Sequence, residues 1–297
     1  MRATTQLRSL LGEPGMLVAP GCVDALSGLV VRHLGFKALY VTGSGMEASM
    51  LGHPDIGLKT LTETTMQAGR IADAAGIPVI CDGEAGFGSY VNMARAVREF
   101  EKAGVAAIHI EDQETPPNSP SVKSRRILPR DRALGMVKAA LDARTDPDFV
   151  IIARSDADEI SLEELVERSN LYLEAGADMA MPQIWKIDGE AYMDLPVDRV
   201  LEAHRRVCRE VNGPTLGLAL PTEVTVEQVE RLGYKIFIYP GDAVQASVSA
   251  MYGVLKELRD TGTTKGYFDR NPRMDGALYK GMLRTDEWLD LEKRYSP

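Results

Sequence analysis

The sequence has little cysteine, no long apolar run and a deficit of basic charge. Its 297 residues include three cysteines, Cys22, Cys81 and Cys208, which are too few and too widely spaced to predict a disulfide framework or a structural zinc site. No apolar run approaches the roughly 18 residues needed to cross a bilayer, and the N-terminus lacks the apolar segment of a secretory signal. We therefore expect a cytoplasmic protein with no membrane partner.

The charge balance excludes a further class of partner. There are 34 Lys and Arg against 43 Asp and Glu, so the formal net charge is −9. This acidity argues against broad contact with a phosphate backbone, and we expect no nucleic-acid partner. With 44% hydrophobic and 26% charged residues, the composition is that of a globular protein whose number of domains must come from the pattern.

Eight short runs rich in Val, Ile and Ala recur along the chain, each followed by a stretch of helical period. They begin at Met16, Lys37, Ile77, Ala106, Phe149, Asp178, Pro214 and Tyr234. Because the runs are apolar throughout, they predict strands buried on both faces, as in a parallel sheet covered by helices. Without a Pro- or Ser-rich linker, the pattern favours one (β/α)₈ TIM barrel over a doubly wound sheet. Residues 1–297 are expected to form a single barrel domain, with 262–297 a C-terminal helical extension.

Charged residues stand where three neighbouring strands are expected to end. Asp82 and Glu84 follow the third strand, Glu111 ends the fourth, and Arg154 lies at the end of the fifth. Three carboxylates at one rim repel one another unless a hard cation neutralises them, and Mg²⁺ takes such oxygen ligands. The spacing therefore indicates a divalent metal site, although a carboxylate at a strand end can also cap a helix or pair with Arg154.

Two loops are candidates for holding a substrate. After the second strand, GSGMEA resembles a dinucleotide fingerprint, but its position is wrong for one. Its backbone N–H groups, with the hydroxyls of Thr42 and Ser44, could instead hold a carboxylate or phosphate oxygen. The long polar segment from Gln113 to Arg132 is either an active-site lid or a mobile surface loop. Among the remaining candidates, His109 is interpreted as structural, and Cys81 as pointing away from Asp82.

Several motifs together resemble the isocitrate lyase and phosphoenolpyruvate mutase superfamily. They are PGCVDALS, VTGSGMEASMLGHPDIG, CDGEAGFG, AGVAAIHIEDQ and DFVIIARSDA, in that order. The similarity runs from about Leu10 to Tyr295 and is nearest to the 2-methylisocitrate lyase and carboxyphosphonoenolpyruvate mutase branch. The resemblance implies a barrel whose eighth helix is exchanged between subunits, with the extension packing on a partner in a homotetramer, a dimer of helix-swapped dimers.

The resemblance also assigns roles to individual positions. The family's Mg²⁺ ligands, for which Mn²⁺ can substitute, correspond to Asp82, Glu84 and Glu111, with Asp55 nearby. Its substrate-carboxylate loop corresponds to Thr42, Gly43 and Ser44, and its anchoring arginine to Arg154. The remaining expected substrate-binding or catalytic positions are Tyr40, Asp82 and Gln183 in the barrel, and Asn118 and Ser119 on the lid.

The chain departs from the lyase pattern at four places. Lyases carry a K-[KR]-C-G-H motif on the lid, whereas this lid has Pro116-Pro117-Asn118-Ser119-Pro120 and no cysteine. Gln183 replaces a glutamate, Leu218 replaces an asparagine, and the first metal motif is Asp-Gly-Glu instead of Asp-x-Asp. These departures put ordinary methylisocitrate lyase activity in doubt.

We therefore expect a Mg²⁺-dependent carbon–carbon lyase or decarboxylase acting on a small 2-oxo or 2-hydroxy di- or tricarboxylate. Decarboxylation has little need of the lid cysteine. Asn118-Ser119 resembles the lid of phosphoenolpyruvate mutases and phosphonopyruvate hydrolases, so phosphorus–carbon chemistry is the alternative. A binding protein that keeps the carboxylate loop but has lost turnover is the third reading.

Overall fold

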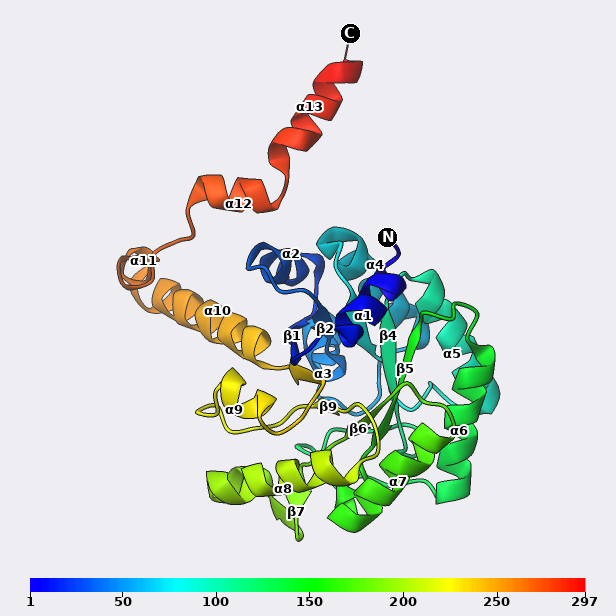
Figure 1. Cartoon of the computed structure of the whole chain (residues 1–297). Helices are drawn as coiled ribbons and strands as arrows, with labels where there is room; N and C mark the ends of the chain where they lie inside the picture. The colour runs from blue at the N-terminus through cyan, green and yellow to red at the C-terminus, as the bar shows by residue number, and fades with distance from the viewer. Residues whose placement is uncertain (297) are drawn as a thin grey trace.

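The computed structural model describes residues 1–296 and contains an eight-stranded parallel sheet rolled into a barrel (Figure 1). The strands neighbour one another in the order β6-β5-β4-β3-β2-β1-β10-β9. Between the two end strands, Ala180 and Thr215 form a parallel bridge, which brings the edges of the sheet together. The strands are β1 (Leu17–Cys22), β2 (Leu39–Val41), β3 (Val79–Asp82), β4 (Ala107–Glu111), β5 (Val150–Ser155), β6 (Met179–Pro182), β9 (Leu216–Gly217) and β10 (Ile236–Tyr239).

All eight predicted strands are therefore confirmed, and so is the (β/α)₈ class. A short antiparallel hairpin, β7 (Lys186–Ile187) with β8 (Glu190–Ala191), was not predicted because each of its strands has only two residues. It follows β6 at the carboxyl end of the barrel.

Helices cover the outside of the barrel, and local sequence determines where several of them begin. They are α2 (Ala25–His33), α4 (Leu61–Ala75), α5 (Tyr90–Lys102), α6 (Arg130–Ala143), α7 (Leu162–Glu174), α8 (Val197–Glu210) and α9 (Val226–Glu230). Thr60 and Ser161 accept hydrogen bonds from the third backbone N–H of the helices that follow them, which is the usual way to satisfy a free helix end. Gly76 ends α4 in the left-handed conformation that glycine adopts without steric cost.

Alternation along each strand divides the apolar side chains between two cores. On β3, Ile80 belongs to the core inside the barrel, whereas Cys81 belongs to the core between the strands and the helices. This arrangement agrees with the prediction that Cys81 points away from Asp82. The N-terminal helix α1 (Ala3–Gly12) adds the fully buried Leu7 to the interior core.

The C-terminal helices leave the barrel. Helix α10 (Asp242–Thr261) has no buried side chain, and α11 (Lys265–Arg270), α12 (Gly276–Met282) and α13 (Thr285–Tyr295) continue outward from it, shown in orange and red in Figure 1. The chain leaves the barrel at Asp242, twenty residues before residue 262, where the sequence predicted that the C-terminal extension begins. Within residues 1–296, no helix combines the length and apolar character needed to span a membrane.

Candidate active site

A cavity of about 390 Å³ opens at the carboxyl ends of the barrel strands. Its lining includes every predicted site residue except Gly43, namely Tyr40, Thr42, Ser44, Asp55, Asp82, Glu84, Glu111, Asn118, Ser119, Arg154 and Gln183. Gly43 lies directly behind them, because a β-carbon at this position would come within 2.3 Å of Asp82 Oδ2. The tertiary structure thus brings together residues that span more than 140 positions of the sequence.

Asp82 ends β3 and lies above the interior of the barrel. Its Oδ1 accepts a hydrogen bond of 2.9 Å from the backbone N–H of Glu84, and the Tyr40 hydroxyl lies 3.4 Å from its Oδ2. His109, which the sequence indicated as structural, is wholly buried inside the barrel and lies 2.8 Å from the Tyr40 hydroxyl. Burial lowers the pKa of His109 to about 4, so a neutral ring lies beneath the cavity near neutral pH.

Glu84 occupies the turn after β3 in a conformation that is rare for a residue with a side chain. Its φ is +51°, a strained value that sites of function often contain. Its carboxylate contacts the ammonium of Lys59, a residue that sequence analysis did not single out. Burial, reinforced by the charge of Asp82, raises the pKa of Glu84 to about 8.

Glu111 and Arg154 form a buried ion pair across neighbouring strands. The two residues are register partners on β4 and β5, and Arg154 Nη1 lies 2.7 Å from Glu111 Oε2. Arg154 also donates a 2.9 Å hydrogen bond from Nη2 to Asp156 Oδ1. Burial raises the pKa of Glu111 well above its ordinary value, although Arg154 opposes the increase.

Asp55 reaches the cavity from the loop between η1 (Glu47–Leu51) and α4. Burial, with the negative charge of Asp82 next in importance, raises the pKa of Asp55 to about 6. The loop is held by Glu47, whose buried carboxylate accepts backbone hydrogen bonds from residues 56, 58 and 59. Nothing in the local sequence indicated that Glu47 would be buried.

The donor set fits a divalent cation in ligand type and in charge. Four carboxylates face the cavity, those of Asp55, Asp82, Glu84 and Glu111. When all four are ionised, as a bound cation would favour, Lys59 and Arg154 balance two of these charges and an excess of two negative charges remains. Oxygen ligands with this excess charge suit Mg²⁺. Among residues 1–296, however, no three His, Cys, Asp or Glu side chains are arranged to hold a metal ion, and Glu84 and Glu111 pair with Lys59 and Arg154 instead.

The loop after β2 presents polar groups to the same cavity. Thr42 precedes helix α3 (Gly43–Met46), and its hydroxyl lies 3.4 Å from that of Ser44. Backbone N–H groups in the first turn of a helix have no partner within the helix. Gly43 and Ser44 therefore offer donors suited to an anionic oxygen, as the sequence predicted for this loop.

The segment between β4 and α6 covers the cavity as a lid. Gln113 and Ile127 pair across its base, and the backbone N–H of Ser119 donates a 3.1 Å hydrogen bond to the carbonyl of Asp55. With its amide oriented so that the nitrogen is the donor, Asn118 contacts the carbonyl oxygens of Ser119 and Lys123. The lid interpretation of this segment is thus supported by its contacts across the mouth of the cavity.

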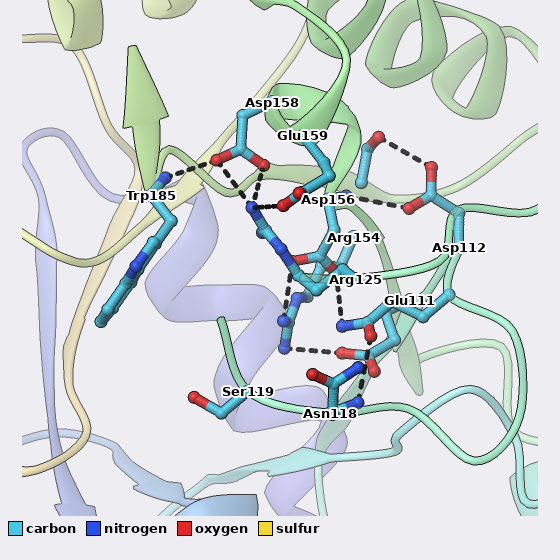
Figure 2. A network of polar contacts seen from close by, with 12 residues as sticks. Glu111, Asp112, Asn118, Ser119, Arg125, Arg154, Asp156, Asp158, Glu159 and Trp185 are labelled. Atoms are coloured by element: carbon cyan, nitrogen blue, oxygen red, sulfur yellow. Dashed lines mark hydrogen bonds and ion pairs between the residues drawn. The ribbon is translucent and has the colours of Figure 1, made fainter. Parts of the chain in front are cut away.

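A buried arginine that the sequence did not indicate anchors this lid. Arg125 lies 2.8 Å from Asp156 Oδ1, 3.0 Å from Asp158 Oδ1 and 3.2 Å from Glu159 Oε2 (Figure 2). Asp158 in turn accepts 2.7 Å hydrogen bonds from the backbone N–H groups of Trp185 and Lys186. The network ties the lid to the ends of β5 and β6, and its only signal in the sequence was an Arg-Arg pair followed by an acidic cluster far along the chain.

None of the three thiols, all of which lie within residues 1–296, lines the cavity. Cys22 and Cys81 are buried, and burial raises the pKa of Cys22 to about 12 and that of Cys81 well above its ordinary value. Cys208 lies on α8, near Thr215. The lining also includes the apolar residues Met181, Trp185, Leu218, Pro240 and Val244.

Comparison with known proteins identifies relatives along nearly the whole chain. Residues 7–259 match the family described as phosphoenolpyruvate phosphomutase. The 2,3-dimethylmalate lyase of Eubacterium barkeri is 40% identical over 302 residues, covering 100% of this chain and 99% of that protein. The 2-methylisocitrate lyase of Aeropyrum pernix is 37% identical over 271 residues, covering 89% of this chain and 82% of that protein.

Solved structures agree with these relatives. An oxaloacetate acetylhydrolase in complex with 3,3-difluorooxalacetate has a TM-score of 0.85 and 28% identity, covering 98% of this chain and 96% of that one. A phosphonopyruvate hydrolase in complex with oxalate and Mg²⁺ has a TM-score of 0.84 and 25% identity, covering 99% of both chains.

Proposed function

The chain belongs to the phosphoenolpyruvate mutase and isocitrate lyase superfamily, and from this premise we propose that it is a Mg²⁺-dependent carbon–carbon lyase or decarboxylase for a small 2-oxo or 2-hydroxy di- or tricarboxylate. One observation carries the proposal. A single cavity combines a cluster of four carboxylates, an arginine held by two ion pairs and a loop of anion-binding donors.

Asp82, Glu84 and Glu111, with Asp55 nearby, are the proposed holders of the ion. When bound, Mg²⁺ or Mn²⁺ would supply positive charge against the substrate's carboxylate and the oxygen beside it. The charge and ligand type of the cluster support this assignment, as does the phosphonopyruvate hydrolase relative, whose structure contains oxalate and Mg²⁺.

The remaining polar groups bind and orient the substrate. The hydroxyl of Ser44 and the first-turn N–H groups at Gly43 and Ser44 donate to an anionic oxygen, and Thr42 positions this loop. Such donors lower the barrier when negative charge develops on the oxygen as the carbon–carbon bond breaks and an enolate forms. Arg154, held by Glu111 and Asp156, offers a positive charge fixed by two ion pairs. Tyr40 and Gln183 also line the cavity.

The absence of a thiol from the described cavity lining favours reactions that need no cysteine acid or base. Decarboxylation is one of them, because the bond that breaks releases carbon dioxide and the electron pair stays on the oxo acid as an enolate. The enolate then needs only one proton from water or a hydroxyl. Oxaloacetate is therefore the first substrate to test, followed by 2,3-dimethylmalate and 2-methylisocitrate, the substrates named for the two relatives.

A substrate panel in Mg²⁺ or Mn²⁺, read as the 2-oxo acid formed, tests the proposal. Ser44→Ala should lower kcat/KM about 100-fold, because it removes one donor to the developing charge. Ser49→Ala is the matched control, since Ser49 is exposed on η1 and bonds only to the carbonyl of Met46. Absence of a 2-oxo acid from every substrate, or equal loss in both variants, would contradict the proposal.

Phosphorus–carbon chemistry is the second candidate, favoured by the position of Asn118 and Ser119 on the lid beside the cavity. Phosphonopyruvate turnover that falls at least tenfold in Asn118→Ala, with oxaloacetate turnover absent, would favour this alternative. The reverse substrate preference would support the lyase or decarboxylase.

We propose that the chain, a single barrel, assembles into a homotetramer made of two helix-swapped dimers. In each dimer, residues 262–297 of one chain pack on the partner. Helix α10 carries an apolar stripe at helical spacing, with Val248, Met251, Tyr252 and Leu255 each at least 50% exposed. A twenty-residue helix with such a stripe and no buried side chain is suited to covering a second copy.

Solution mass tests the assembly. The wild type should have about four times the chain mass of 32.5 kDa by light scattering, and Leu255→Asp should break the assembly. Ala250→Asp introduces the same charge on the opposite side of α10 and should keep the wild-type mass. A monomeric wild type would contradict the exchange.

A further inference from the structure

Lys59 is a buried cation for which the proposed chemistry has no use. Only 1% of its side chain is exposed, and its ammonium contacts Glu84 Oε1 while lying 3.9 Å from Glu47 Oε1. Lysine is almost never fully buried unless it is paired, and here the partner is a proposed metal ligand. The positive charge of Lys59 lies next to Glu84, a proposed metal ligand, and repels a divalent cation that binds there.

The loop around Lys59 is fixed on both sides. Glu47 accepts hydrogen bonds from the backbone N–H groups of Leu58 and Lys59, at 2.7 and 3.2 Å. On the other side, Gly57 has a φ of +74°, and a β-carbon there would come within 2.8 Å of Pro116 on the lid. The backbone at Lys59 is therefore fixed, and its buried side chain holds the ammonium beside Glu84.

The oxygen that Lys59 contacts is the one that faces Asp82. A β-carbon on Gly43 would lie 2.3 Å from Asp82 Oδ2 and 3.1 Å from Glu84 Oε1, so both oxygens lie against the same glycine. Lys59 thus binds the carboxylate cluster at the point where two of its members converge. A divalent cation that used both carboxylates would have to share Glu84 with the ammonium or displace it.

We propose that Lys59 is a built-in cation of the carboxylate cluster that competes with the divalent ion for Glu84 and thereby weakens metal binding. This inference rests on the proposed function, since it takes the cluster to be the metal site. Removing the charge of Lys59 should free Glu84 and tighten metal binding.

Titration with Mn²⁺, followed by the electron paramagnetic resonance signal of the free ion, tests the proposal on the intact protein. Lys59→Met and Lys59→Gln should each bind Mn²⁺ about tenfold more tightly than the wild type, because each removes one positive charge beside the ion. Lys59→Gln keeps a hydrogen-bond donor to Glu84 and serves if the methionine variant does not fold. Lys59→Arg keeps the charge and should retain the wild-type affinity. Lys37→Met, which removes an exposed lysine paired with Glu13, is the matched control and should also leave the affinity unchanged.

If Lys59→Gln binds Mn²⁺ no more tightly than the wild type does, the proposed role of Lys59 is wrong. If the wild type nevertheless binds Mn²⁺ and turns over an oxo acid, the proposed function stands and only this inference fails. If neither the wild type nor the two neutral variants bind Mn²⁺, and no oxo acid is consumed, both fail.

Discussion

Arg125 of the lid donates a 2.8 Å hydrogen bond to Asp156 Oδ1 at the end of β5, and both side chains are fully buried. The same oxygen accepts a 2.9 Å hydrogen bond from Arg154, which lines the cavity. One carboxylate oxygen therefore links the base of the lid to the arginine of the site, so the position of the lid and the orientation of Arg154 depend on each other (Figure 2).

Arg125→Met should destabilise the protein by about 3–5 kcal/mol in the free energy of unfolding, because it leaves Asp156 and Asp158 buried without this partner. Urea unfolding measures the change. The neighbouring Arg126 is the control: its side chain is 70% exposed and pairs only with the half-exposed Glu114, so Arg126→Met should cost about 1 kcal/mol or less. Similar losses in both variants would show that the buried network does not stabilise the lid.

Gly43→Ala should disrupt the carboxylate cluster, because its β-carbon would come within 2.3 Å of Asp82 Oδ2 and push that carboxylate away. We expect loss of Mn²⁺ binding and a decrease in kcat/KM of about 100-fold or more, as small displacements in a site cost this much. Gly12→Ala is the control, since a β-carbon at Gly12 meets nothing within 4 Å. Full Mn²⁺ affinity in Gly43→Ala would mean that Asp82 is not needed for the ion.

Arg154→Lys should lower kcat/KM about 100-fold even though the positive charge remains. Arg154 donates to Glu111 and Asp156 through two different nitrogens, and the single ammonium of lysine does not reproduce this fork. Arg144→Lys, which alters an arginine paired with Asp178 away from the cavity, should leave kcat/KM within about twofold of the wild type. Steady-state kinetics on the substrate identified by the panel decides between these outcomes.

His204 should make the protein sensitive to acid. Burial lowers its pKa from 6.5 to about 3, so the ring is neutral in the folded protein and becomes protonated in the unfolded chain below pH 6.5. Because the unfolded state then binds more protons, stability falls as the pH decreases from 6.5 toward 3, by up to about 1.4 kcal/mol per pH unit from this group.

His204→Gln should remove this contribution while keeping a hydrogen-bonding side chain near the Tyr234 hydroxyl. The free energy of unfolding of His204→Gln, relative to that of the wild type, should therefore increase steadily as the pH falls from 6.5 to 4. Ser49→Ala, at an exposed position with no titratable group, should show no such trend. A difference between wild type and His204→Gln that is constant with pH would be evidence against the buried neutral ring.

Much of the barrel was predictable because its signals are local. Each strand is a run of apolar residues, and runs buried on both faces occur in a parallel sheet. The identities of the cavity residues were also predictable in large part, since parallel strands end at one rim and Asp82, Glu111 and Arg154 each stand at such an end. Their exact roles stay predictions.

The sequence by itself determined the fold class, the end of the barrel that carries the cavity, and the residue types that line it. Only the tertiary structure decided which charges pair there. Lys59 and Glu84 are 25 positions apart, and Arg125 and Asp156 are 31 apart, so no local period or motif joins them. Their pairing depends on how the loops after β2 and β3, and those after β4 and β5, pack against one another. A buried charge is tolerated only where the folded chain brings a partner to it.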